Sequence, residues 1–337
     1  MRDSQRILPH RRVALMQLEE IRALVTEDLK SVDQTIVDRL ASDVVLVNQI
    51  SRYIVGGGGK RLRPLSVVLA ARACGHAGDK HVAAAAIIEF IHTSTLLHDD
   101  VVDSSDKRRG RDTANHVFGN QASVLVGDYL YSRSFQMMVE LGDMRIQDVM
   151  ADATNTIAEG EVMQLMNVHD PDTSEQRYFE VIYRKTAKLF EAGAQVAAIL
   201  SASPPAVEEA MVAYGRHLGT AFQLVDDVLD YTASADELGK NLGDDLAEGK
   251  PTLPVIHTLA HASAPDAARL RNAIEHGGLG DLADITRLIQ ASGGLEYTAR
   301  VAQQEKDAAV AALGPVPASE YRDALAALAE FAVARTY

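Results

Sequence analysis

Two acidic motifs have a composition that could bind a metal ion. In each, three aspartates interrupt an apolar segment that otherwise has the pattern of a buried helix. The spacing is the same in both motifs: Asp99, Asp100 and Asp103 in the first, and Asp226, Asp227 and Asp230 in the second. Residues three and four apart share a helix face, so these like charges repel, and burying them without a cation is costly. The repeated motif therefore predicts a metal ion held between two helices.

The candidate ligands restrict which metal this would be. They are carboxylate oxygens, and the sequence has neither a Cys/His cluster for zinc nor the pair of Glu-x-x-His motifs that di-iron bundles use. Sites built from oxygen alone suit Mg²⁺, Mn²⁺ or Ca²⁺. Because Mg²⁺ usually combines one or two carboxylates with substrate phosphates, we expect it to bridge a phosphorylated ligand to the aspartates. One such motif alone could equally be a solvated helix face.

Basic residues lie where a phosphorylated ligand requires them. Four consecutive glycines precede Lys60 and Arg63, and Pro64 suits the first turn of the next helix. Backbone N–H groups at a helix start attract anions, and arginine offers phosphate two parallel donors. A second basic run follows the first acidic motif and could be a surface salt-bridge patch or a phosphate contact, which we favour: Lys107, Arg108 and Arg109.

The bulk composition excludes several classes of protein. The chain has 337 residues, of which 47% are hydrophobic, enough to bury a substantial core. A formal net charge of −14 argues against broad electrostatic binding of nucleic acid. The single cysteine, Cys74, permits no intrachain disulfide and fits a reducing compartment. We see no signal-peptide pattern and no apolar run long enough to span a membrane, so we expect a cytoplasmic protein.

The pattern of apolar residues is helical along most of the chain, and the alternation typical of strands is missing. We therefore predict an all-α protein, with a flexible N-terminal tail over residues 1–12 and a single helical domain over 13–337. One helix is expected over about 32–55. Glycine and proline clusters bound the later helices, which are expected over 64–74, 80–103, 120–141, 145–168, 174–202, 206–231, 252–262, 266–276, 281–291, 294–313 and 317–335.

Further motifs occur in a fixed order along the chain. They are Gly58 to Pro64, His92 to Asp103, Arg108 to Gly110, Ala158 to Glu161, Lys185 to Ala187, Phe222 to Asp230, Gly239-Lys240, and Gly243 to Pro254. This combination resembles the trans-prenyl diphosphate synthases over roughly residues 13–335. The segments Phe135 to Met138 and Gln164 to Val168 are most similar to the bacterial octaprenyl-forming members.

The resemblance implies an all-α bundle of the isoprenoid synthase type with a central catalytic cavity, and a homodimer. It implies head-to-tail condensation of isopentenyl diphosphate onto an allylic diphosphate such as farnesyl diphosphate. The implied cofactor is Mg²⁺, with Mn²⁺ as a substitute. The implied product is a long all-trans chain, octaprenyl diphosphate for quinone side chains. Neither nucleic acid nor a transmembrane segment is expected.

The same resemblance assigns roles by motif position. The metal positions, some acting through bound water, are Asp99, Asp100, Asp103, Asp226, Asp227 and Asp230. Contacts to the allylic diphosphate are expected from Arg108, Lys185 and Lys240. Isopentenyl diphosphate would be held by Lys60, Arg63, His92 and Arg109. Beside the reacting carbons we expect Thr186 and Gln223.

Product length is expected to depend on Ser94 and Thr95, one helical turn before Asp99. Neither is aromatic, which would leave a tunnel open for a long chain, although small residues could simply let helices pack closely. A farnesyl or geranylgeranyl diphosphate synthase would differ only in the depth of this tunnel. A terpene cyclase would need no second diphosphate site, so Lys60, Arg63 and Arg109 argue against a cyclase. A non-catalytic partner subunit would tend to lose the acidic motifs.

Overall fold

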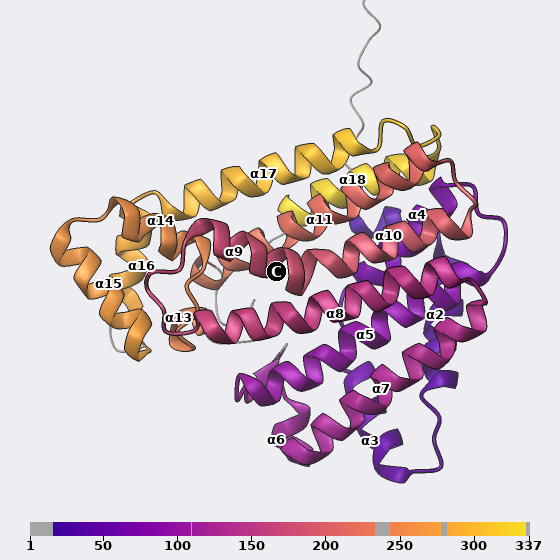
Figure 1. Ribbon diagram of the computed structural model, residues 1–337, viewed down its shortest axis with the longest axis horizontal. Coiled ribbons are helices and arrows are strands. Elements are labelled where there is room, and N and C mark those ends of the chain that lie inside the picture. Colours follow the sequence, from indigo (N-terminus) through magenta and orange to yellow (C-terminus); the bar gives the residue numbers. More distant parts are fainter. Residues whose placement is uncertain (1–15, 109, 233–242, 278–281, 335–337) are drawn as a thin grey trace, which may run out of the picture.

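The computed structural model describes residues 16–108, 110–232, 243–277 and 282–334, and almost all of its regular structure is α-helical (Figure 1). The expected all-α fold class is confirmed. The expected tail over residues 1–12 lies outside the described residues, as do two of the expected site residues, Arg109 and Lys240.

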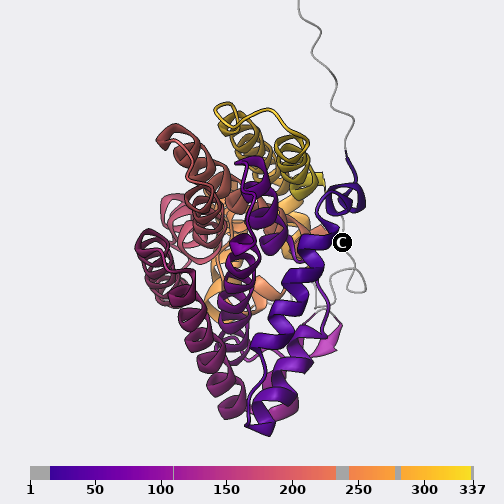
Figure 2. The ribbon, with the colours of Figure 1, turned by 90° about the vertical axis from the view of Figure 1, so that its right-hand side faces the viewer.

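The long helices of the chain run side by side and form the body of the molecule (Figure 1). Its first half contains α1 (Leu18–Ala23), α2 (Thr26–Arg39), α3 (Val45–Val55), α4 (Leu62–Ala73), α5 (Lys80–Val102), α6 (Ala114–Phe118), α7 (Asn120–Leu141) and α8 (Met144–Asn167). Helix α5 packs against α2, α4 and α7, and their buried apolar residues join those of α8, α10, α11 and α18 in the main core. Seen from one end, the N-terminal helices lie along one side of the bundle (Figure 2).

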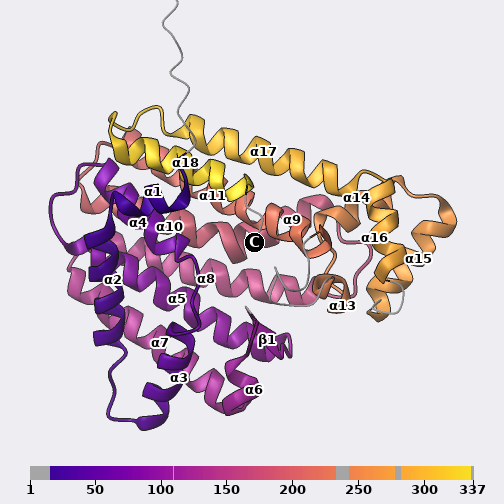
Figure 3. The ribbon, with the colours of Figure 1, turned by 180° about the vertical axis from the view of Figure 1, so that it is seen from behind.

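The second half completes the bundle and adds a cluster of short helices at one end. It contains α9 (Glu175–Ile182), a π-helical turn η1 (Tyr183–Ala187), α10 (Lys188–Leu200), α11 (Pro205–Thr232), α13 (Asp244–Ala247), α14 (Leu253–His261), α15 (Ala264–His276), α16 (Leu282–Ala291), α17 (Gly294–Ala312) and α18 (Glu320–Ala334). Helices α13 to α16 gather beyond the end of α8, and α17 returns along the bundle (Figure 3). None of the described helices combines the length and apolar character that a membrane crossing requires.

The helix expected over 32–55 is wrong, because α2 ends at Arg39 and α3 begins at Val45. The break contains neither glycine nor proline. Instead, the Asn48 side chain accepts a hydrogen bond from the backbone N–H of Ser42 at 3.1 Å and donates one to its carbonyl oxygen at 2.6 Å. Such side-chain bonds satisfy backbone groups that a continuous helix would have paired.

A two-stranded hairpin is a second departure from the expected pattern. Strand β1 (Lys107–Arg108) pairs antiparallel with β2 (Arg111–Asp112), with Arg108 opposite Arg111. Gly110 has a φ of 72°, a left-handed conformation that glycine adopts at little cost in a tight turn. The hairpin is too short to give an alternating pattern, and it holds Arg108 next to the end of α5.

The crossing of α10 and α11 depends on two glycines. A Cβ on Gly215 would lie 2.5 Å from the carbonyl oxygen of Phe190, and one on Gly219 would lie 2.5 Å from the Cα of Ala187. Real Cβ atoms do not approach backbone so closely, so α11 can contact the backbone of η1 and α10 only because these positions lack side chains. This contact fixes the second acidic motif relative to Lys185 and Thr186.

We expect Gly215→Ala to lower the free energy of unfolding by about 1–3 kcal/mol, the usual cost of overpacking a tight core. The direction is diagnostic, because alanine in a helix would by itself stabilise the protein by up to ~1 kcal/mol. Urea denaturation of the two proteins measures the difference. A more stable variant would contradict the close crossing of α10 and α11.

Candidate active site

A cavity of about 690 Å³ lies between the ends of α5 and α11. Both acidic motifs contribute to its wall, and so do basic residues from several other elements. Its charged lining includes Asp99, Asp103, Asp226, Asp227, Asp245, Glu161, Glu248, Lys60, Arg63, Arg108, Lys185 and Lys250. Acidic residues that are 127 positions apart in the chain (226 minus 99) therefore face a single space, as the repeated motif predicted.

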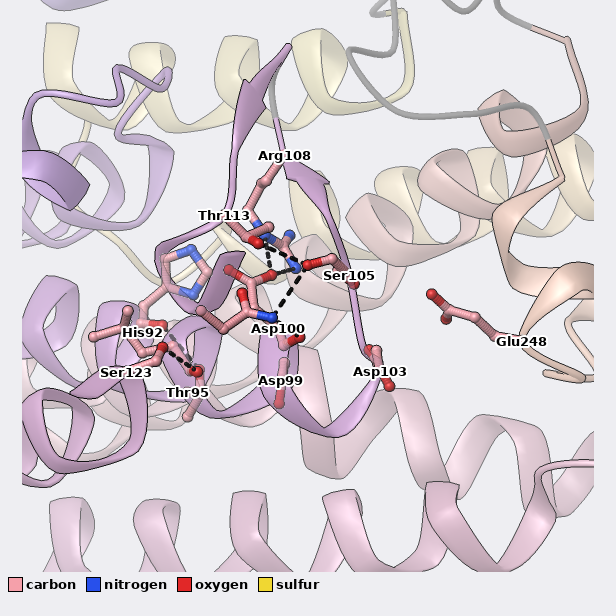
Figure 4. A network of polar contacts seen from close by, with 12 residues as sticks. His92, Thr95, Asp99, Asp100, Asp103, Ser105, Arg108, Thr113, Ser123 and Glu248 are labelled. Carbon is pink, nitrogen blue, oxygen red and sulfur yellow. Dashed lines mark hydrogen bonds and ion pairs between the residues drawn. The ribbon is translucent and has the colours of Figure 1, made fainter. Parts of the chain in front are cut away.

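The first acidic motif divides its three carboxylates between two tasks. Asp99 and Asp103 line the cavity, whereas Asp100 is buried and does not. The Asp100 carboxylate accepts a hydrogen bond from Nε of Arg108 at 2.8 Å, and Nη2 lies at the same distance. In Figure 4 Asp100 points toward Arg108, and Asp99 and Asp103 extend away from it. Burial raises the pKa of Asp100, and the positive charge of Arg108 opposes this shift. The contact between the two side chains holds Arg108 at the cavity.

The second acidic motif is divided in a similar way. Asp226 and Asp227 line the cavity, and Asp230 is fully buried outside the lining. The carboxylate of Asp230 accepts a hydrogen bond from the backbone N–H of Asp245 at 3.3 Å. The backbone carbonyl oxygen of Asp230 accepts one from the backbone N–H of Gly243 at 2.9 Å. Asp230 thus attaches the start of α13 to the end of α11.

Two lysines lie between the carboxylates of the cavity. Nζ of Lys185 is 2.6 Å from Glu161 and 3.4 Å from Asp99. Nζ of Lys250 is 2.9 Å from Asp103 and 2.5 Å from Glu248. Burial lowers the pKa of each lysine, but the adjacent carboxylates outweigh it, and the net shift of both pKa values is upward. Both lysines are therefore positively charged at neutral pH.

The π-helical turn η1 explains how Lys185 and Thr186 reach the cavity together. The expected helix over 174–202 continues through α9, η1 and α10, and Lys185 and Thr186 of the π-helical turn both line the cavity. A Cβ on Gly160 would lie 2.9 Å from the backbone nitrogen of Lys185, so α8 approaches this turn without a side chain between them. Turns of this kind are frequent at functional sites.

A chain of hydrogen bonds connects η1 to the second acidic motif. The Thr186 hydroxyl donates to Oε1 of Gln223 at 2.9 Å, and Nε2 of Gln223 donates to Oδ1 of Asp227 at 2.9 Å. The Tyr178 hydroxyl donates to Oδ2 of Asp227 at 2.5 Å. Thr186 and Gln223, both expected beside the reacting carbons, are in direct contact and both line the cavity.

A second basic group lies on another part of the cavity wall. Lys60, Arg63 and His92 all line it, and Nη1 of Arg63 is 3.1 Å from Nε2 of His92. The Arg63 guanidinium also lies over the ring of Phe190, 4.8 Å from its centre, which fixes its plane. His92 of α5 is 29 positions after Arg63 in the sequence, and the structure brings the two side chains into contact.

The two expected chain-length residues have different surroundings. Thr95 lines the cavity. Ser94 is buried, and its hydroxyl donates to the carbonyl oxygen of Gly127 in α7 at 2.8 Å. Ser94 is thus not part of the described cavity wall.

Several residues of the site were not singled out from the sequence. Lys250 and Glu248 lie within the segment Gly243 to Pro254, whose family-like pattern was the available signal. Glu161 likewise lies in the matched segment Ala158 to Glu161. Tyr178 had no signal of its own, because a tyrosine in an amphipathic helix usually belongs to the core.

The carboxylates do not form a preformed metal cage. Among the described residues, no three Asp, Glu, His or Cys side chains are close enough to hold one ion together. Lysines instead occupy the spaces beside Asp99 and Asp103. This donor set fits Mg²⁺, which takes one or two protein carboxylates and completes its shell with phosphate oxygens and water. It would fit zinc poorly, since nitrogen and sulfur ligands are lacking.

Comparison with known proteins places this geometry in a family. A family model described as "Polyprenyl synthetase" matches residues 44–291. The chain belongs to the polyprenyl synthetase family. It is 55% identical over 321 residues to the octaprenyl diphosphate synthase of Escherichia coli, covering 95% of this chain and 99% of that protein. Identity to an all-trans-nonaprenyl-diphosphate synthase from Rhodobacter capsulatus is 45% over 318 residues, covering 94% of this chain and 98% of that protein.

Solved structures of this family share the fold. A polyprenyl synthase from Caulobacter crescentus, complexed with calcium and isoprenyl diphosphate, superposes with a TM-score of 0.92 at 43% sequence identity. The match covers 96% of this chain and 99% of that one. Family membership accounts for the shared fold.

We expect Lys250→Gln to weaken binding of pyrophosphate in the presence of Mg²⁺ by tenfold or more, on the order of one charge-assisted hydrogen bond. The substitution removes a cation and leaves Asp103 and Glu248 facing each other. Isothermal titration calorimetry measures the affinity. Lys30→Gln, which removes an exposed lysine that pairs with Glu27 outside the cavity, is the matched control. Equal affinities for the two variants would show that Lys250 does not contact the anion.

Proposed function

We propose that this chain is a long-chain all-trans polyprenyl diphosphate synthase that condenses isopentenyl diphosphate head to tail onto an allylic diphosphate. The proposal rests on one cavity that is lined by acidic motifs from α5 and α11 and by basic residues from several other elements. The identity of 55% to an octaprenyl diphosphate synthase favours octaprenyl diphosphate as the product and a role in making quinone side chains.

The allylic diphosphate would bind beside the acidic motifs. Asp99, Asp103 and Asp226 line the cavity there and would hold Mg²⁺, or Mn²⁺ in its place. When bound, the metal neutralises charge on the departing diphosphate. Cations of the chain meet the same charge: Arg108, Lys185 and Lys250, together with Lys240 as its motif position implies. Asp100 and Asp230 would not bind the ligand directly. They would position Arg108 and Asp245 through hydrogen bonds.

Isopentenyl diphosphate would bind to the second basic group. Lys60, Arg63 and His92 line that part of the cavity, and Arg109 joins them by its motif position. Two anionic substrates then have two cationic subsites. In the reaction the carbon–oxygen bond of the allylic diphosphate breaks, and the double bond of isopentenyl diphosphate attacks the allylic carbon. A new carbon–carbon bond forms, and one proton passes to the released diphosphate.

Thr186 and Gln223 would lie beside the allylic cation. Their hydroxyl and amide oxygens stabilise positive charge without reacting with it, as fixed dipoles do in a site that excludes water. The hydrogen bond between them keeps both oxygens at the cavity wall. No charged base is needed there, because the leaving diphosphate accepts the proton.

The competing functions fit this cavity less well. A terpene cyclase binds one diphosphate and has no use for the basic group of Lys60, Arg63 and His92. A non-catalytic partner subunit would not need acidic motifs whose carboxylates are paired with cations as closely as here. The family also contains shorter-chain enzymes, so product length is tested separately below.

We also propose that the chain forms a homodimer through α7 and α8, which pack against each other. Large apolar side chains are exposed on both helices, among them Leu125 and Val139 on α7 and Val162 and Leu165 on α8. Exposed apolar patches of this kind mark interfaces, and a second copy of the chain offers a self-complementary partner.

Sedimentation velocity should give a mass of twice the 36.4 kDa of one chain, and Val139→Asp should shift the measured mass toward that of one chain. A wild-type monomer would contradict this.

The function is tested by removing one carboxylate from each motif. We expect Asp99→Asn and Asp226→Asn each to lower the rate of condensation at saturating Mg²⁺ by roughly 100-fold or more, the usual cost of losing a charge-stabilising group. A radiolabelled assay with isopentenyl and farnesyl diphosphate measures the rate. Asp43→Asn, at an exposed position between α2 and α3, is the control. Near wild-type rates in the two motif variants would refute metal-assisted condensation.

Product length is tested at Thr95. We expect Thr95→Phe to shorten the product while the first condensation is largely retained, because an aromatic ring would fill cavity space that the growing chain needs. Thr95→Val, of similar size to threonine, should leave the length unchanged. Ser94→Phe is less informative, since Ser94 packs on Gly127 and the substitution should destabilise the fold. Chromatographic sizing of the products decides, and an unchanged length in Thr95→Phe would exclude this tunnel.

A further inference from the structure

Asp227 differs from Asp99 and Asp103, which also line the cavity. Asp99 and Asp103 are paired with lysines, whereas both oxygens of Asp227 accept hydrogen bonds from uncharged side chains. These donors are the Tyr178 hydroxyl at 2.5 Å and the Gln223 amide at 2.9 Å. Asp227 is 1% exposed and Tyr178 is 4% exposed. With both oxygens engaged and the group buried, Asp227 is arranged to hold its neighbours.

The contact with Asp227 decides which way the Gln223 amide faces. An ionised carboxylate can only accept hydrogen bonds, so Oδ1 of Asp227 accepts one from the NH₂ end of Gln223. The carbonyl end of Gln223 must then face the other way, toward the Thr186 hydroxyl. The Thr186 hydroxyl donates its only proton in this hydrogen bond, and the lone pairs of its oxygen remain available to a ligand in the cavity. The order Tyr178, Asp227, Gln223, Thr186 thus fixes the direction of each hydrogen bond.

This direction matters for the chemistry of an allylic cation. Oxygen lone pairs aimed at a developing positive charge stabilise it, whereas an inverted amide would aim its N–H groups at the cation and oppose it. Tyr178 lies on α9, and its partners lie on η1 and α11. The hydroxyl of Tyr178 is therefore the point at which α9 supports the orientation of groups on two other elements.

We propose that Tyr178 is a positioning residue that acts through Asp227 to hold the Gln223 and Thr186 oxygens toward the reacting carbons, and that Asp227 serves as this anchor and not as a metal ligand. The inference rests on the proposed condensation activity. The inference goes beyond that activity because it gives Tyr178 a task in the reaction and assigns Asp227 a different role from Asp226.

The test compares near-isosteric substitutions, the first of them at two buried tyrosines. Tyr178→Phe removes only the hydroxyl, and we expect the single-turnover rate of the first condensation to fall on the order of tenfold. The KM values for both diphosphates should change less than twofold, because the diphosphate contacts are made elsewhere. Tyr214→Phe is the matched control: Tyr214 is fully buried and donates to the carbonyl oxygen of Leu325 outside the cavity. It should lower thermal stability and leave the rate unchanged.

A binding measurement separates the anchor from a metal ligand. Calorimetric titration of Mn²⁺ into the protein with pyrophosphate should give wild-type affinity for Asp227→Asn and a loss of about tenfold or more for Asp226→Asn. Equal losses in the two variants would overturn the anchor assignment of Asp227. Equal rates for Tyr178→Phe and Tyr214→Phe would overturn the positioning role of Tyr178. If the wild-type protein condensed nothing, the proposed function itself would fail, which is a different outcome.

Discussion

Lys185 and Lys250 each lie between two carboxylates that would otherwise repel each other across the cavity. The site depends on this balance of charge, because buried carboxylates without a cation are costly in free energy. The lysines place positive charge beside two carboxylates of the first acidic motif before any ligand binds. A diphosphate with Mg²⁺ brings both signs of charge, so it can enter such a network without leaving a group unpaired.

The helices around the cavity are packed to hold this charge pattern in place. Gly215 and Gly219 let α11 contact the backbone of η1 and α10, and Gly160 lets α8 approach η1. The positions of Lys185, Thr186 and the second acidic motif are therefore set by backbone contact and not by adjustable side chains. Rigid placement of this kind is what electrostatic stabilisation of a reaction requires, since little reorganisation is left to occur during the step.

Helical periodicity and charge repulsion were sufficient to predict the all-α fold and one cavity that contains Asp99, Asp103 and Asp226. They could not predict which carboxylates face away, because Asp100 and Asp230 are turned by contacts with Arg108 and Asp245 that are made outside the motifs. The break between α2 and α3 depends on the Asn48 side chain and has no glycine or proline signal. Likewise, Tyr178 acquires its partner only when α9 packs beside α11.

The most direct test of the account is to incubate the purified wild-type chain with Mg²⁺, isopentenyl diphosphate and farnesyl diphosphate and to determine the products by mass spectrometry. The account predicts octaprenyl diphosphate as the main product, formed by this chain alone and abolished by a chelator. A cyclic hydrocarbon formed from farnesyl diphosphate without isopentenyl diphosphate, or a requirement for a second polypeptide, would contradict it.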